Sequence, residues 1–178
     1  MGRKYKIRDS DRLYFVTFTV VEWLNVFADD NNIDIVIDSL NFCQQNKGLE
    51  VYAWVIMPNH IHMVIGRNGK LTLSQIIQDF KRHTSSKIRK YLQNDSGSIM
   101  YQILVMQGLG NTRNTDFQLW QQHSHPVEVS SDKMFDQRVD YIHMNPVKAG
   151  LVEFPVDWKW SSAIDYNEGK GFLELNYT

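Results

Sequence analysis

The order of hydrophobic and polar residues predicts strands and helices in alternation. β-Branched and aromatic residues dominate three segments that we predict to be strands, at residues 13–21, 49–57 and 60–66. Pro58 and Asn59 separate the second segment from the third, and proline cannot donate a hydrogen bond to a strand ladder. We therefore expect a hairpin whose tight turn lies at these two residues.

Three further segments carry apolar residues at helical spacing, at about residues 29–46, 73–92 and 132–145. Thr72 and Gln75 have the pattern of a capping box at the start of the second helix, and Pro146 should end the third. Residues 93–117 are polar and rich in Asn, Gly, Gln and Ser, which predicts a long loop or insertion. A fourth strand is expected around residues 118–129, before the third helix.

The resulting order is strand, helix, strand, strand, helix, strand, helix. It predicts an α+β fold, a ferredoxin-like sandwich with an antiparallel sheet and its helices on one face. A chain of 178 residues is long enough to bury one core, so residues 1–178 are expected to form a single domain.

Composition and charge exclude several classes of protein. Hydrophobic residues make up 43% of the chain, yet no apolar run approaches the roughly 20 residues that span a bilayer. The single cysteine, Cys43, excludes an intramolecular disulfide and a multi-cysteine metal site. We expect a cytoplasmic protein without a membrane partner. Because the net charge is −1, any contact with nucleic acid must depend on local basic patches.

The third predicted strand carries two histidines, His60 and His62, on either side of Ile61. Side chains alternate between the two faces of a strand, so both imidazoles should project from one face while Ile61 enters the core. Two imidazoles on one face provide half of a metal site. By itself such a pair is more often structural or surface-exposed than metal-binding.

The last predicted helix carries polar groups that could complete this site. Tyr141 and Asn145 are four residues apart and lie on one helix face, with Arg138 one turn earlier. Two imidazoles and one amide oxygen would leave coordination positions open for a phosphate oxygen. A tyrosine with a pKa of about 10 needs such an activated phosphate in order to act as a nucleophile, which suggests phosphoryl transfer through a phosphotyrosine. The alternatives are a tyrosine that only packs and an asparagine that only ends the helix.

Basic residues gather in two places that could contact DNA phosphates. The second helix carries five of them, namely Lys81, Arg82, Lys87, Arg89 and Lys90, and the amino terminus carries Arg3 and Lys4. Their usual meaning is a solvated surface, and their functional meaning is a phosphate track. Tyr91 lies among these residues and competes with Tyr141 as a nucleophile, but it lacks a polar ligand four residues later within the helix.

Three motifs in this order resemble the single-tyrosine HUH transposases, and more narrowly the REP-associated tyrosine transposases. They lie at residues 55–62, 139–150 and 158–163. The resemblance spans nearly the whole chain except residues 93–117. It implies that His60, His62 and Asn145 hold Mg²⁺ or Mn²⁺, and two histidine nitrogens suit Mn²⁺ better.

The resemblance further implies that Tyr141 attacks a phosphodiester of single-stranded or hairpin DNA. The products would be a 5′-phosphotyrosine and a free 3′-OH, which are later rejoined, in a protein associated with the bacterial nucleoid. It leaves open whether the protein acts alone or as a homodimer in which the tyrosine serves the partner's metal site. One alternative is a relative that binds hairpins without cutting them. A histidine-triad phosphoesterase fits poorly, because Val64 stands where a third alternating histidine is needed.

Overall fold

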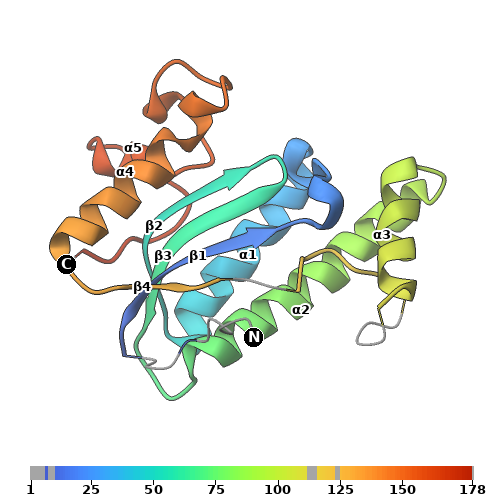
Figure 1. Cartoon of the computed structure of the whole chain (residues 1–178), viewed down its shortest axis with the longest axis horizontal. Coiled ribbons are helices and arrows are strands. Elements are labelled where there is room, and N and C mark those ends of the chain that lie inside the picture. Colours follow the sequence, from blue (N-terminus) through green and yellow to red (C-terminus); the bar gives the residue numbers. More distant parts are fainter. Residues whose placement is uncertain (1–6, 8–10, 112–115, 123–124, 178) are drawn as a thin grey trace, which may run out of the picture.

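The sheet has four antiparallel strands in the order β2-β3-β1-β4 (Figure 1). This computed structural model describes residues 7, 11–111, 116–122 and 125–177. The strands are β1 (Leu13–Thr19), β2 (Leu49–Met57), β3 (His60–Arg67) and β4 (Val127–Val129). The two central strands, β1 and β3, pair through six positions from Tyr14↔Ile65 to Thr19↔His60. The predicted α+β class and the antiparallel sheet with its β2–β3 hairpin are confirmed.

The longer helices begin at residues that cap them. They are α1 (Asp30–Lys47), α2 (Leu73–Leu92), α3 (Ile99–Leu109) and α4 (Asp132–Lys148), followed by the short α5 (Ala163–Tyr166). Single 3-10 turns lie at η1 (Val21–Trp23), η2 (Val26–Ala28), η3 (Gln93–Asp95) and η4 (Pro155–Asp157). Thr72 and Gln75 form the predicted capping box of α2. In the described part of the chain, none of the helices is long and apolar enough to cross a membrane.

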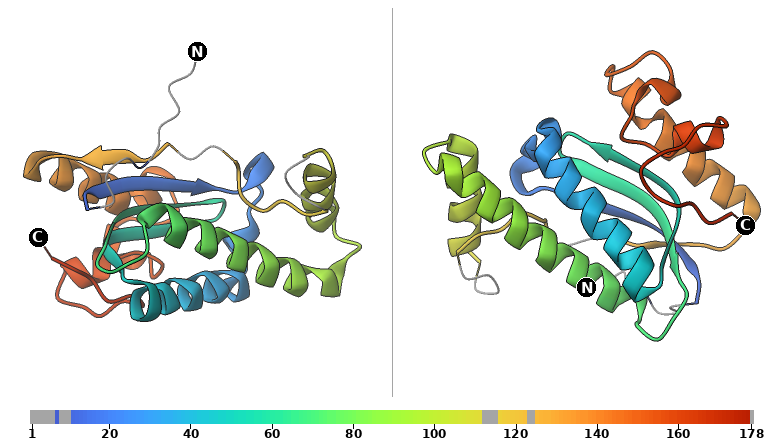
Figure 2. Two further views of the ribbon diagram at one scale, coloured as in Figure 1. Left: turned by 90° about the horizontal axis from the view of Figure 1, so that it is seen from below. Right: turned by 180° about the vertical axis from the view of Figure 1, so that it is seen from behind.

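Helices cover both faces of the sheet, so the prediction of helices on one face was wrong. Val16, Phe18 and Trp54 belong to the large core that α1 and α2 cover. Figure 2 shows these two helices together on one side of the sheet. Phe15 and Val55 point the other way and pack with Val139 and Ile142 of α4, and the two clusters share none of these residues. Strands that are apolar on both faces need cover on both, and helical spacing alone does not say which face a helix takes.

Part of the predicted polar loop is a helix. Within residues 93–117, α3 spans Ile99–Leu109 and is capped by the Ser98 hydroxyl, which accepts from the Tyr101 backbone N–H. Polar residues flank this mostly apolar segment on both sides, and its two glutamines do not form a polar face, so the segment gives no amphipathic signal. Figure 1 shows α3 at the end of α2 that lies away from α4.

The carboxyl-terminal half differs from the prediction in two boundaries. The expected fourth strand, at residues 118–129, is broken: β4 begins only at Val127, while Trp120 forms a separate bridge with Val20 beyond the end of β1. The last helix does not stop at Pro146 but continues to Lys148, and the Ala149 N–H reaches the Asn145 carbonyl at 3.0 Å. A proline in the final turn removes only one backbone donor, so the turn still closes around it.

Candidate active site

The two histidines lie side by side on the sheet face that α4 covers. Their ring centroids are 4.7 Å apart, and His62 is buried, with 6% of its surface exposed. Thr17 pairs with His62 in the β1–β3 register, and its Oγ1 lies 2.8 Å from the His62 Nδ1. The alternation of β1 places Thr17 on the same face. The strands therefore fix both the position and the rotation of the His62 ring.

The turn between β2 and β3 orients His60. Its Nδ1 lies 2.7 Å from the Oδ1 of Asn59, while the Asn59 amide nitrogen donates to the carbonyl of Trp23 and to the Oδ1 of Asn25. An amide oxygen only accepts, so the network assigns the ring proton to Nδ1 and leaves a lone pair on Nε2. This is the form in which an imidazole binds a metal, oriented by a polar group behind it.

Helix α4 brings Tyr141 against this pair. The Tyr141 ring centroid is 5.1 Å from that of His62 and 5.8 Å from that of Phe15, and Phe15 in turn stacks on His62 at 5.4 Å. Tyr141 keeps 38% of its surface exposed, so a ligand can approach it from solvent. The tyrosine and the histidines that it contacts belong to the same chain.

Asn145, one helical turn beyond Tyr141, completes the group of predicted residues. Its side chain hydrogen bonds to His60. Tyr141 and Asn145 face the sheet together because α4 repeats every 3.6 residues. The structure therefore brings together the four residues that the sequence analysis predicted for the metal and the nucleophile: His60, His62, Tyr141 and Asn145.

Both imidazoles are held in the neutral form. Burial, and to a lesser extent the neighbouring His60, together lower the pKa of His62 to about 3. Burial also lowers the pKa of His60, against the opposing effect of its hydrogen bond with Asn145. Neutral imidazoles bind metals without first losing a proton.

The donor set fits a divalent cation with open coordination positions. In the described part of the chain, no three His, Cys, Asp or Glu side chains gather as a metal site. A third donor would therefore have to come from another residue type. Asn145, whose side chain contacts His60, carries an amide oxygen of the kind that suits Mg²⁺ or Mn²⁺. Two nitrogens and one oxygen leave room for phosphate oxygens, unlike a structural zinc site closed by four protein ligands.

Two cations border the site. The Arg138 guanidinium lies over the Phe15 ring, 4.9 Å from its centroid, and the Lys148 Nζ lies 5.8 Å from the centroid of Tyr141. Both residues belong to α4, and Arg138 was among the predicted DNA contacts. Their positive charge favours an anionic substrate near the tyrosine.

The motif at residues 158–163 anchors α4 to the sheet, a role that the sequence did not reveal. The Ser162 hydroxyl contacts the His143 Nε2 at 2.9 Å and also bonds to the backbone N–H and carbonyl of Trp54. The Trp158 indole N–H donates to the Ile56 carbonyl at 2.9 Å. These bonds tie the helix that carries Tyr141 to β2. The partners of Ser162 and Trp158 on β2 lie more than 100 residues earlier in the chain, so the only sequence signal for this role was the motif itself.

The other predicted DNA contacts do not join this site. Lys81, Arg82, Lys87, Arg89 and Lys90 lie on α2, which covers the opposite face of the sheet. Arg82 forms an ion pair with Asp79, and Arg89 with Asp116. The side chains of Lys87 and Lys90 are exposed. Arg3 and Lys4 lie outside the described residues.

Tyr91 is committed elsewhere, in keeping with the preference for Tyr141. Its hydroxyl donates to the Asp29 Oδ2 at 2.9 Å, and this hydrogen bond raises the pKa of Tyr91. Asp29 caps α1, so the contact joins the two helices on the face away from the histidines.

Comparison with known proteins defines the class of this chain. Residues 14–103, just over half of its length, match the family described as IS200-like transposases, and the chain belongs to that family. It is 29% identical over 119 residues to the REP-associated tyrosine transposase of Escherichia coli strain K12, a match that covers 67% of this chain. The matched part spans only 57% of the length of that relative.

Two further likenesses extend over more of the chain. A Haemophilus influenzae protein is provisionally named a REP-associated tyrosine transposase. It is 25% identical to this chain over 155 residues, which cover 84% of this chain and 78% of that protein. A solved structure of a REP-associated tyrosine transposase bound to a REP hairpin superposes with a TM-score of 0.69. It covers 99% of this chain and 93% of the other at 16% identity, so it establishes a shared fold.

Proposed function

We propose that this protein is a DNA transposase that cuts and rejoins single-stranded or hairpin DNA through a phosphotyrosine at Tyr141. One observation carries the proposal: the Tyr141 ring centroid lies 5.1 Å from that of His62 in the same chain, and the Asn145 side chain hydrogen bonds to His60. Membership of the IS200-like transposase family supports the reaction class. Because tyrosine and histidines come from one chain, a single copy could assemble the site.

The proposed step is a displacement at phosphorus. The Tyr141 oxygen forms a bond to the phosphorus of a phosphodiester, and the bond from phosphorus to the 3′ oxygen breaks. The phenol gives up its proton and the departing oxygen gains one, which leaves a 5′-phosphotyrosine and a 3′-OH. Attack by a 3′-OH on the same phosphorus reverses the step and rejoins a strand.

The side chains divide this work between them. His60, His62 and Asn145 would hold Mg²⁺ or Mn²⁺, which when bound supplies Lewis-acid polarisation of the phosphate. Thr17 and Asn59 keep the two imidazoles in position. Arg138 and Lys148 would balance the charge of the phosphate beside the tyrosine. Ser162, through His143, holds α4 in register with the sheet.

Hairpin DNA is the substrate that the likenesses favour. The solved structure with the same fold is described as bound to a REP hairpin, and the E. coli and H. influenzae relatives carry REP-associated names. We infer that this chain binds DNA of the same kind, a short hairpin with unpaired strand beside it.

The test is a search for a covalent adduct. The protein is incubated with labelled hairpin DNA that carries unpaired extensions, together with Mn²⁺, and the products are run on a denaturing gel. We expect an adduct with the wild type and with Tyr91→Phe, the matched control, and none with Tyr141→Phe. An adduct that persists in Tyr141→Phe would refute the nucleophile. Hairpin binding without any adduct across both metals would instead indicate a relative that binds but does not cut.

A further inference from the structure

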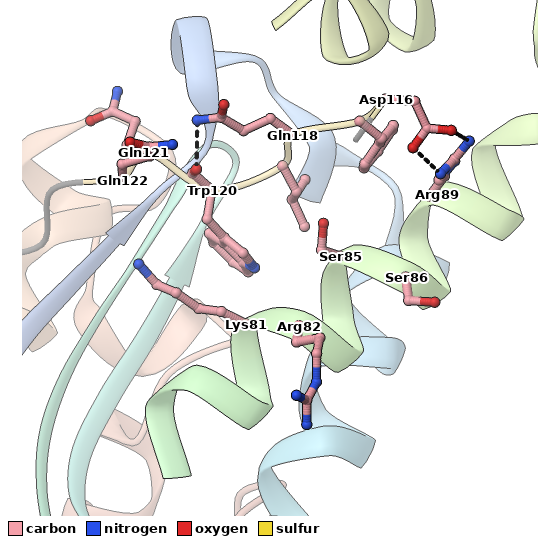
Figure 3. A pocket seen from close by; sticks show the side chains of 12 residues that line it. Lys81, Arg82, Ser85, Ser86, Arg89, Asp116, Gln118, Trp120, Gln121 and Gln122 are labelled. Carbon is pink, nitrogen blue, oxygen red and sulfur yellow. Dashed lines mark hydrogen bonds and ion pairs between the residues drawn. The ribbon is translucent and has the colours of Figure 1, made fainter. Parts of the chain in front are cut away.

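A polar pocket lies away from the histidines, between α2 and residues 116–122. Its volume is about 410 Å³, within the range of small-molecule sites. Figure 3 shows Lys81 reaching from α2 toward Trp120, at the end of the pocket where Gln121 and Gln122 lie. Ser85 also lines the pocket, from the next turn of α2.

Among the described residues, Lys81 is the cation of this pocket that has no counter-ion. Its Nζ lies 5.1 Å from the centroid of the Phe18 ring, and its side chain is half-buried. In the described part of the chain it forms no ion pair, and burial lowers its pKa to about 8. A partly buried ammonium without a counter-charge is costly, so a bound anion would stabilise it.

The two arginines that line the pocket, Arg82 and Arg89, already have partners. Arg89 makes two parallel bonds to the Asp116 carboxylate, at 2.6 and 2.5 Å, and Arg82 bonds to Asp79. The first pair also fastens the segment at residues 116–122 to α2. The Trp120 indole N–H donates to the buried Thr84 hydroxyl at 3.0 Å, which joins the same segment to α2 at a second point. The walls are therefore held in place before any ligand binds.

The pocket wall on α2 lies on the sheet face opposite the histidines, but Gln121, which also lines the pocket, lies at the sheet edge near the candidate active site. The Gln121 backbone N–H donates to the Thr19 carbonyl at 2.8 Å, and Thr19 pairs with His60 across the β1–β3 ladder. Gln121 and His60 are thus two strand spacings apart, about 10 Å. A strand of DNA whose phosphate reaches the histidines can extend over this edge of the sheet and enter the pocket within a few nucleotides.

We propose that this pocket binds one unpaired nucleotide of the DNA strand, with its phosphate at Lys81 and its base edge at Gln121 and Gln122. Glutamine amides both donate and accept, which suits the edge of a base. This inference rests on the proposed function and adds a subsite for the strand beside the cleaved phosphodiester.

The test compares two fluorescent hairpins, one with four unpaired nucleotides at each end and one blunt, by anisotropy. Lys81→Met keeps the aliphatic stem and removes the charge, and Lys87→Met is the matched control on the exposed face of α2. We expect Lys81→Met to lose about tenfold or more in affinity for the extended hairpin, with a salt slope lower by about 1, and little for the blunt one. Lys81→Arg should restore binding of the extended hairpin.

A second variant separates the pocket from general electrostatics. Ser85→Phe fills the pocket without a change of charge and should weaken only the extended hairpin. Circular dichroism melting confirms that each variant is folded. Equal losses for both hairpins, or equal losses in Lys81→Met and Lys87→Met, would overturn the pocket. Failure of the wild type to bind either hairpin would instead refute the proposed function.

Discussion

Replacing Thr17 with valine tests whether the histidine pair is a prepared metal site. The Thr17 Oγ1 lies 2.8 Å from the His62 Nδ1, on the inner side of a ring with only 6% exposure. If the His62 Nε2 faces the metal, Nδ1 carries the proton and donates to this hydroxyl. Valine preserves the branched shape and the strand preference but removes the acceptor.

The expected effect follows from the burial of the ring. An N–H that loses its acceptor at this partly buried site lowers the free energy of unfolding by about 1–2 kcal/mol. For a chain of this length that lowers the Tm by roughly 2–8 °C. Loss of a hydrogen bond that orients a metal ligand also weakens metal binding, by about 10- to 100-fold. Metal affinity should therefore fall by more than the change in stability alone suggests.

The assay pairs thermal melting without metal with Mn²⁺ titration by calorimetry. Thr19→Val is the control, since Thr19 lies on the same face of β1, pairs with His60 and makes no side-chain hydrogen bond among the described residues. We expect Thr17→Val to bind Mn²⁺ at least tenfold more weakly than Thr19→Val. Equal affinity in the two variants would refute the role of Thr17 in orienting His62.

Three further outcomes are expected. Ser162→Ala removes the buried hydroxyl that joins His143 to Trp54 and should cost about 1–3 kcal/mol in urea unfolding; an unchanged midpoint would contradict the anchoring of α4. As the pH rises through about 8, the Lys81 ammonium loses its proton, so affinity for the extended hairpin should fall. The free energy of unfolding should rise over the same range, because the unfolded chain still holds that proton up to its ordinary pKa of 10.5. Lys81→Arg should remove both trends, since arginine stays charged. EDTA should abolish the covalent adduct on gels while hairpin binding in anisotropy persists, and an adduct formed in EDTA would exclude a metal role.

Local periodicity explains why the core of the site could be predicted from sequence. His60 and His62 share a strand face because side chains alternate, and Tyr141 and Asn145 share a helix face because they are four residues apart. The resemblance to the transposases joined the two pairs. Their contact in space depends on α4 packing against the β2–β3 face, and the sequence had predicted the helices on one face only.

The remaining features depend on contacts that no local pattern encodes. Thr17 and Asn59 look like ordinary strand and turn residues until the register places them behind the imidazoles. Helix α3 is mostly apolar, and its two glutamines, Gln102 and Gln107, do not form a polar stripe, so its polar flanks dominated the prediction. Arg89 was predicted as a phosphate contact, but its partner Asp116 lies 27 residues away, and only the folded chain brings them together.

The most direct measurement is to identify the residue that carries the DNA. Trypsin cuts after Arg138 and Lys148, so Tyr141 is the only tyrosine in the peptide at residues 139–148. After nuclease digestion of the purified adduct, mass spectrometry should find a 5′-linked nucleotide on this peptide. Its formation should require Mn²⁺ or Mg²⁺ and intact His60 and His62. A nucleotide on any other peptide, or an adduct that forms without the histidine pair, would contradict the proposed site.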